Sequence, residues 1–323
     1  MKNDFYKIYL RLTLAQMFWA GAFVAGQLAL INQPPVFTAF IRNGLSTLGF
    51  ILVLFCFKKG KTKAPSKSTF LSLMWMGFFG VFLYTILVYC GLKKTTAISA
   101  SLLIPTTQPL FTVLLSKLIY REPLKISQIV GLSFGFIGAI CVMSGSWALK
   151  PSLDDMIGNI LMLGGALAFS IYSLFGKAVL KELEPLETVT YSTLIGSLLL
   201  FPLAIILDKS VFDFKTIEPT FWICMSYMVI FAGILPYLWW YSGVKILGAS
   251  KTASITFLLP PFALFLAVII LHQRVSTFQI IGGCLGLLGV AFATGFIDNI
   301  KQEGGYKKIF NLNFKYKLPG GKN

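Results

Sequence analysis

Ten stretches of this chain contain no Asp, Glu, Lys or Arg. They are 12–41, 43–57, 68–92, 95–116, 126–149, 156–176, 188–207, 219–244, 252–273 and 275–297. A helix needs about 20 apolar residues to cross the hydrocarbon core of a bilayer. All the stretches reach that length except 43–57, which is short only because Arg42 interrupts the apolar run 32–57. Backbone polar groups that lie in lipid must be satisfied within their own segment. Each stretch is therefore predicted to form a helix.

The fold class that follows is an all-α integral membrane protein with ten transmembrane helices. The expected spans are 9–31, 36–57, 69–92, 96–117, 126–146, 156–177, 187–207, 219–242, 250–271 and 276–297. Charged residues make up 12% of the chain and hydrophobic residues 56%. Soluble domains carry about 25% charged residues, so the composition excludes an ordinary water-soluble enzyme. The high hydrophobicity also excludes a disordered chain.

The basic residues predict the orientation. The formal net charge is +16. With the N-terminus in the cytoplasm, the inside segments hold most of the Lys and Arg residues, including the linker 58–67 and the tail 299–323, which places both termini inside. The charge is spread between apolar runs and faces anionic lipid headgroups, so no nucleic-acid partner is expected. We predict a multi-pass protein of the inner or plasma membrane.

The chain contains an internal repeat. Two segments align without gaps at a constant offset, and near the start of each half Pro35 falls on Pro185. The matching pairs are Pro109 and Pro260, Gln128 and Gln279, Gly131 and Gly282, Gly135 and Gly286, and Gly138 and Gly289. Several identities at one offset indicate duplication. Because each half has an odd number of helices, the second half enters the membrane from the opposite side, as in inverted-repeat transporters. The expected units are 1–150, 151–298 and the basic tail 299–323.

The repeated segments resemble a known family. They read SASLLIPTTQPLFTVLLSKLIYREPLKISQIVGLSFGFIGAICVMSG at 99–145 and KTASITFLLPPFALFLAVIILHQRVSTFQIIGGCLGLLGVAFATG at 251–295. A proline in the fourth helix, an acidic residue at the turn (Glu122) and a glycine-rich fifth helix are similar to the EamA-type group of the drug/metabolite transporter superfamily. Trp19 and Arg42 match the opening of that pattern. The second half departs from it, because Gln273 stands where Glu122 has its equivalent.

The resemblance implies a non-enzymatic transporter with a central cavity and alternating access, and it favours export. It covers essentially residues 9–297 and is weak for substrate. Amino acids or related zwitterions are our preferred substrates. A sugar, a phosphorylated metabolite or a drug is the alternative within the fold, and a membrane-embedded lipid-modifying enzyme is the alternative in another class. No cofactor is expected, no metal-ligand spacing is present, and the choice between monomer and homodimer stays open. No Asp or Glu lies in the centre of a span, which argues against proton antiport through an embedded carboxylate.

Polar side chains within the spans mark the candidate substrate site. Ser101, Pro105 and Gln108 share one face of the fourth helix, with Thr106 beside them. Prolines release backbone carbonyls, which are tolerated at membrane depth only against protein or a cavity. The other candidates are Thr252 and Thr256 on the ninth helix, and kinks are expected at Pro105, Pro109, Pro236 and Pro260. A kink without substrate contact is the alternative.

Arg42 is predicted to lie within the second span, where it can bind a carboxylate or phosphate or extend to the interface. On the first helix, Gln16, Trp19 and Phe23 share a face that we expect to point inward. The weaker candidates are Tyr84 and Tyr172. We interpret the aromatic cluster formed by Tyr237, Trp239, Trp240 and Tyr241 as an interfacial belt rather than a substrate cage.

Small residues recur at close spacing on the fifth and tenth helices. They are Gly131, Gly135, Gly138, Gly282, Gly286 and Gly289. Such spacing allows helices to approach closely in lipid. We predict that each helix packs against its own half, and a dimer face is the alternative.

Overall fold

The computed structural model describes residues 2–57, 65–120, 125–149, 152–207, 217–247, 252 and 255–293. Within these residues the chain is helical and has no strand. The first half contains α1 (Lys2–Ala29), α2 (Pro35–Phe57), α3 (Lys67–Met76), the π-helix η1 (Gly77–Leu83), α4 (Tyr84–Leu92), α5 (Ala97–Tyr120) and α6 (Ile126–Leu149). The second half contains α7 (Leu153–Val179), α8 (Pro185–Leu207), α9 (Pro219–Val229), the π-helix η4 (Ile230–Ile234), α10 (Leu235–Leu247), the 3-10 helix η5 (Ile255–Leu258), α12 (Leu259–Leu271) and α13 (Thr277–Ala293).

The helices lie where the charge-free runs predict them. In the described residues, eight helical segments are long and apolar enough to cross a membrane, and 255–271 and 277–293 form shorter apolar helices. The bounds of the eight agree with the expected spans to within a few residues. Pro35, Pro185 and Pro219 each begin a helix, where a missing N–H group costs nothing. Glu122 and the tail 299–323 lie outside the described residues.

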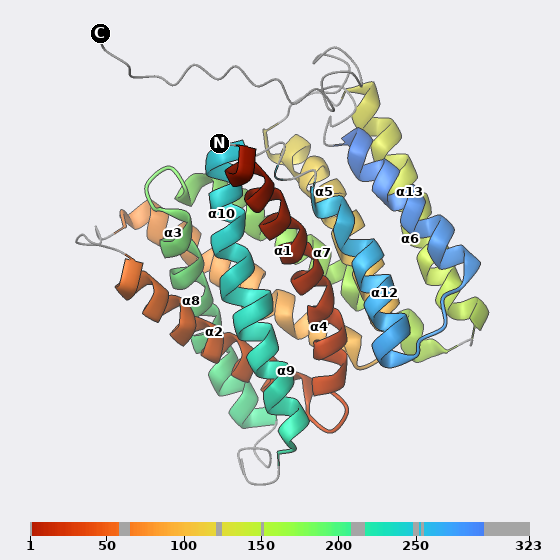
Figure 1. Ribbon diagram of the computed structural model, residues 1–323, viewed down its shortest axis with the longest axis horizontal. Coiled ribbons are helices and arrows are strands. Elements are labelled where there is room, and N and C mark those ends of the chain that lie inside the picture. The colour runs from red at the N-terminus through yellow and green to blue at the C-terminus, as the bar shows by residue number, and fades with distance from the viewer. Residues whose placement is uncertain are drawn as a thin grey trace.

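The two halves pack in matching ways. α2 packs against α8, α5 against α12, and α6 against α13. α1 contacts α9, α10 and α12, just as α7 contacts α3, α4 and α5. Thr47 Oγ1 and Ser197 Oγ, which are 150 residues apart in the chain, lie 3.1 Å from each other. The first turn of α1 and the last turn of α13 lie at the same end of the bundle (Figure 1).

The glycines join the two halves directly. A Cβ at Gly131 would lie 2.6 Å from the Gly289 carbonyl oxygen, and a Cβ at Gly138 would lie 2.7 Å from the Gly282 carbonyl oxygen. These contacts make α6 and α13 antiparallel, and they run side by side at one edge of the bundle (Figure 1). The prediction that each glycine helix packs against its own half describes only part of the packing: α6 also contacts α5, but the closest backbone contacts of the glycines are with the other half. Only backbones without side chains can approach this closely.

Two features interrupt the regular helices. The third helix of each half contains a π-helix, η1 in one and η4 in the other. Wide turns of this kind often occur at functional sites. The expected span 250–271 is also not continuous, because η5 precedes α12 and Pro260 stands in the first turn of α12. The adjacent Pro260 and Pro261 supply no N–H groups, so an α-helix cannot run through them unbroken.

The turn after α7 is fastened to the start of α3. The Glu182 carboxylate accepts hydrogen bonds from the backbone N–H of Ser66 (2.7 Å) and the Ser66 hydroxyl (2.8 Å), and it also accepts one from the Thr69 hydroxyl. The hydrogen bond from Thr69, followed by those from Ser66, lowers the pKa of Glu182. The corresponding contact lies after α1, where Asn32 Nδ2 donates to Glu218 Oε1 at 2.8 Å. Glu218 precedes α9 as Ser66 precedes α3, so the two halves carry equivalent links.

We expect Glu182→Gln to lower the melting temperature of the purified protein at pH 7 but not at strongly acidic pH. A lowered folded-state pKa contributes stability above the unfolded value, and that stability is lost as pH falls through the folded value. Thermal unfolding of both proteins across this pH range measures the difference. Glu184→Gln, at an exposed site in the same turn, is a nearby control. A constant difference at every pH would show that the charge of Glu182 has no part in the link.

Candidate substrate-binding cavity

A cavity of about 460 Å³ lies where the two halves meet. Its walls come from α1, α2, α4, α5, α7, α9, η4, α10, η5, α12 and α13. Of the residues singled out in the sequence, the structure brings the following to this cavity: Gln16, Trp19, Phe23, Arg42, Tyr84, Pro105, Gln108, Pro109, Thr256 and Pro260. These residues are far apart in the chain, and they converge because α1, α5 and α12 pack against one another.

Two side chains of the cavity wall have buried polar atoms without hydrogen-bond partners. Gln16 is 0% exposed, and neither its amide nitrogen nor its amide oxygen has a hydrogen-bond partner. The Nε atom of Arg42 is also buried and unpaired. A buried polar group that is left unsatisfied costs about 1–3 kcal/mol. In a native protein such groups need an explanation, and a bound polar molecule is one.

Aromatic rings form much of the wall. The Trp19 ring lies 5.9 Å from the Tyr237 ring and 5.6 Å from the Trp240 ring. On another side the Tyr84 and Phe169 rings are 5.1 Å apart. The interpretation of Tyr237 and Trp240 as an interfacial belt was wrong, since both line the cavity. Trp239 instead stacks on Phe18 at 5.8 Å, and the Tyr241 side chain lies outside the described part of the chain.

The proline-containing segments supply backbone as well as side chains. Pro105 and Pro109 both lie inside α5, and both line the cavity. Because Pro109 has no N–H group, the Pro105 carbonyl lacks its usual helical donor. The Gln108 carbonyl accepts a hydrogen bond from the Ser170 hydroxyl of α7 at 2.8 Å, which fixes α5 against the second half. Pro236 is buried in the first turn of α10, after η4.

Four predicted residues lie outside this wall. Ser101 is fully buried and donates to the Ile98 carbonyl at 2.9 Å. Thr106 donates to the Leu102 carbonyl at 2.6 Å and packs against Gly286. Thr252 is fully buried away from the cavity. Tyr172 packs against Gly80, and its ring is tilted against the Phe169 ring, with ring centres 5.0 Å apart.

Several wall residues were not singled out from the sequence. They are Thr85, Val88, Tyr89, Leu92, Phe169, Met228, Ala232 and Phe257. One signal was available on the third helix of the first half. Thr85 and Tyr89 are one turn apart, beside Tyr84, so they form a polar stripe that points inward. The Tyr89 hydroxyl lies 3.4 Å from the Met228 sulfur, so it links α4 to α9.

Beyond Leu92, a cluster of amides ties three segments together. Gln27 of α1 donates to the Thr95 carbonyl at 3.2 Å and accepts from the Ala97 N–H at 2.9 Å. Gln273, in the turn between α12 and α13, donates to the Gln27 side-chain oxygen at 2.7 Å and accepts from the Ile98 N–H at 3.3 Å. An amide both donates and accepts, which a carboxylate cannot do. This gives a physical role to Gln273, where the second half departs from the acidic residue of the first.

The cavity wall offers no evident metal site. Arg42 is the only charged residue in the wall, and no acidic residue is part of it within the described chain. Among the described residues, no group of three or more His, Cys, Asp or Glu side chains comes together that could hold a metal ion. The aromatic rings of the wall and the guanidinium of Arg42 suit a molecule with an aromatic or apolar body and a carboxylate or similar anionic group.

A comparison with protein families decides the identity. The model of the EamA-like transporter family matches residues 7–144 and again residues 156–295. The chain belongs to this family. EamA-like relatives include the uncharacterized transporter YyaM of Bacillus subtilis (strain 168), which is 29% identical over 90% of this chain and 94% of its own length. A probable amino-acid metabolite efflux pump of Escherichia coli (strain K12) is 24% identical over 86% of this chain and 91% of its own.

A solved crystal structure shares the fold of this chain. It superposes with a TM-score of 0.61 at 20% sequence identity and covers 92% of this chain and 99% of its own. At this identity the likeness concerns the fold alone. Family membership and the helices together make this chain a multi-pass membrane transporter of small molecules.

Gln16→Leu is expected to raise the stability of the empty protein and to weaken transport. Leu fills a similar volume without an unpaired amide, which should stabilise the fold by about 1 kcal/mol or more. The matched control is Gln33→Leu, because the buried Gln33 also has an unpaired oxygen but lies outside the cavity wall. Thermal unfolding and uptake into proteoliposomes measure the two effects. Wild-type transport by Gln16→Leu would exclude Gln16 from the substrate site.

Proposed function

We propose that this protein moves small organic metabolites with a carboxylate group, best represented by amino acids and related zwitterions, across the cytoplasmic membrane. The observation that carries the proposal is the pair of unsatisfied groups, on Gln16 and Arg42, in an aromatic cavity between the halves. The guanidinium of Arg42 would bind the carboxylate, the Gln16 amide would complete its hydrogen bonds, and Trp19 would pack against the body of the substrate. Gln108 and Thr256 are further binding residues of the proposed site.

The proposed mechanism is alternating access by two inverted repeats, 1–150 and 151–298, with ten transmembrane helices and both termini in the cytoplasm. The two family matches, the matching contacts of the halves and the antiparallel pairing of α6 with α13 support this architecture. In the proposed cycle, the bonds that join Gln27 to Gln273 and Thr95 break when the cavity opens on the non-cytoplasmic side. The name of the Escherichia coli relative favours amino-acid metabolites and export.

Transport by purified protein tests the proposal. Liposomes containing the protein are given a pool of labelled amino acids, with and without a pH gradient, and both uptake and efflux are measured. We expect movement of at least one amino-acid class by the wild type, and strongly reduced movement by Trp19→Ala, Arg42→Ala and Gln108→Ala at matched protein levels. Wild-type rates in all three variants would remove the cavity from the mechanism. Movement of sugars or organic cations alone would reject the proposed substrate class.

A further inference from the structure

The charge of the central cavity is unbalanced. Arg42 is the only charged residue of the described wall, and no carboxylate lines the cavity beside it. The groups close enough to Arg42 to feel its charge include the hydroxyls of Tyr84, Tyr89 and Tyr237. Tyrosine hydroxyls are neutral at pH 7. The described wall therefore carries a net positive charge.

The amino-acid sequence supplies no acidic residue around this cavity. No Asp or Glu occurs from residue 5 to residue 121, or from residue 219 to residue 297. These two stretches contribute every described wall residue except Phe169. The segments that form almost all of the wall therefore have no carboxylate side chain to offer.

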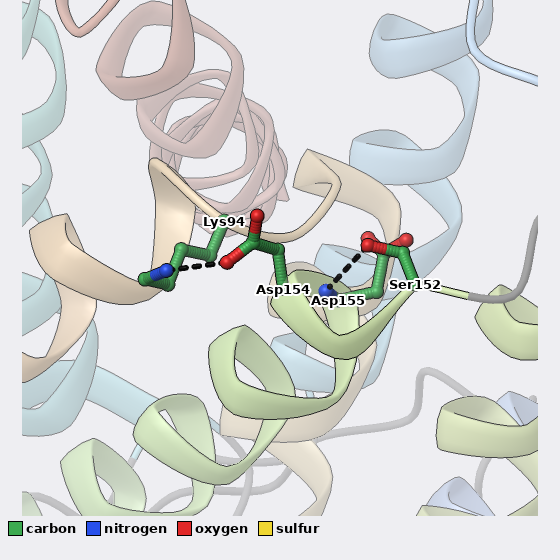
Figure 2. A network of polar contacts seen from close by, with 4 residues as sticks. All are labelled: Lys94, Ser152, Asp154 and Asp155. Carbon is green, nitrogen blue, oxygen red and sulfur yellow. Dashed lines mark hydrogen bonds and ion pairs between the residues drawn. The ribbon is translucent and has the colours of Figure 1, made fainter.

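Phe169 belongs to α7, whose acidic residues lie in its first turn. Asp154 points toward Lys94 there, and its carboxylate oxygen lies 2.5 Å from the Lys94 ammonium (Figure 2). The backbone N–H of the next residue, Asp155, donates to the Ser152 hydroxyl at 3.5 Å (Figure 2). Residues 155 and 169 of this helix are about 21 Å apart at 1.5 Å per residue. The acidic residues of α7 thus lie far along the helix from its contribution to the wall.

This arrangement treats the two charges of a zwitterion differently. A carboxylate can pair with the guanidinium of Arg42. An ammonium group would enter the cavity without a negative partner, and a charge that leaves water unpaired is costly. The rings of Trp19 and Trp240 and the Pro105 carbonyl can contact a cation, but these groups are neutral. Arg42 itself repels a second positive charge.

We propose that the cavity prefers monoanionic carboxylic acids with an aromatic or large apolar body over amino acids of the same skeleton. The inference rests on the proposed function, because it takes Arg42 as the carboxylate site. An acid without an ammonium group neutralises the charge of the described wall, whereas a zwitterion leaves one positive charge unpaired. Amino acids then bind through the carboxylate and the side chain alone. The cavity volume of about 460 Å³ lies within the usual range for sites of small organic ligands.

Three ligands with one carbon skeleton test this preference. They are 3-phenylpropanoate, phenylalanine and 2-phenylethylamine, which carry the carboxylate alone, both groups and the ammonium alone. Isothermal titration calorimetry of the full-length protein in detergent at pH 7 measures their Kd values. Binding in detergent also avoids the passive crossing of a bilayer by the protonated acid. We expect 3-phenylpropanoate to bind about tenfold more tightly than phenylalanine, and the amine to show no saturable binding.

Gln108→Glu assigns the preference to the charge of the wall. This change keeps the shape of the side chain and adds a carboxylate to the cavity. It should weaken binding of 3-phenylpropanoate by about tenfold or more and preserve or strengthen binding of phenylalanine, so that the order reverses. Gln128→Glu is the matched control, because Gln128 lies in the first turn of α6, outside the wall. It should keep the wild-type order.

The outcomes separate this inference from the proposed function. Equal affinities for the two acids in the wild type, tighter binding of phenylalanine, or the wild-type order in Gln108→Glu would overturn the inference. If amino acids move into liposomes but 3-phenylpropanoate does not bind, the proposed function stands and the inference fails. If neither acid binds and no amino acid moves, both are rejected.

Discussion

Arg42→Gln is expected to lower kcat/KM for a carboxylate substrate by about 100-fold. Removing one partner of a buried, hydrogen-bonded charge pair costs about 2–5 kcal/mol, and each 1.4 kcal/mol is about tenfold. The loss should be large because no other charged residue belongs to the cavity wall in the described chain. The kcat/KM of Arg42→Lys should lie between those of the wild type and Arg42→Gln. An ammonium keeps the charge but cannot reproduce the planar double contact of a guanidinium. Initial rates of uptake into proteoliposomes measure the effect.

The matched control for this prediction is Arg274→Gln. Arg274 is exposed in the turn between α12 and α13, so its loss removes the same charge without touching the cavity. Its transport rate should stay close to the wild-type rate. Equal losses in the two variants would show that net charge, and not the position of Arg42, controls transport.

Gly138→Ala is expected to destabilise the protein by about 2 kcal/mol or more, the scale of overpacking in a close-packed interior. The new Cβ would lie 2.7 Å from both the Gly282 carbonyl oxygen and the Gly286 nitrogen. These are backbone atoms, so α6 and α13 must move apart. A larger side chain at the same position, as in Gly138→Leu, should prevent accumulation of folded protein. Thermal unfolding in detergent measures the first variant and membrane yield the second.

Gly44→Ala provides the comparison. It makes the same chemical change inside α2, where a Cβ would meet no atom within 4 Å. Replacing a glycine inside a helix with alanine should be neutral there or stabilise the protein by about 0.5–1 kcal/mol. If Gly138→Ala were as stable as Gly44→Ala, the close approach of α6 and α13 would be refuted.

The positions of the helices could be predicted because a bilayer imposes a length and an absence of charge on each of them. The first residues of α2, α8 and α9 could also be predicted, because Pro35, Pro185 and Pro219 mark them. Internal identities such as Pro109 with Pro260 indicate that a second, related half exists. They do not indicate how the halves pack, so the direct pairing of α6 with α13 was missed.

The cavity could be predicted in part. Gln16, Trp19 and Gln108 were found because a polar side chain in a long apolar run needs a reason. Tyr237 and Trp240 were assigned to the interface because aromatic residues near a helix end usually lie there. Sequence periodicity assumes regular helices, and η4 comes directly before α10. A π-helix changes which residues share a face with those before it, so the inward direction of Tyr237 and Trp240 could not be read from spacing.

Thr106 and Ser101 show a second limit of predicting cavity residues from the sequence. Both hydroxyls donate to carbonyls of their own helix, at 2.6 Å and 2.9 Å. A hydroxyl in an apolar span can satisfy itself in this way without any cavity. Gln16 has no such local partner in the structure, so its unpaired amide is the stronger indicator of a ligand.

Substrate counterflow tests the central claim most directly. Proteoliposomes loaded with an unlabelled amino acid are diluted into a trace of the same labelled amino acid, and internal label is followed with time. Exchange of this kind requires only a binding site that opens to each side in turn. The expected result is transient accumulation of label by the wild type and by Arg274→Gln, and its loss in Arg42→Gln and Trp19→Ala. Counterflow at the wild-type rate in Arg42→Gln and Trp19→Ala would contradict transport through this cavity.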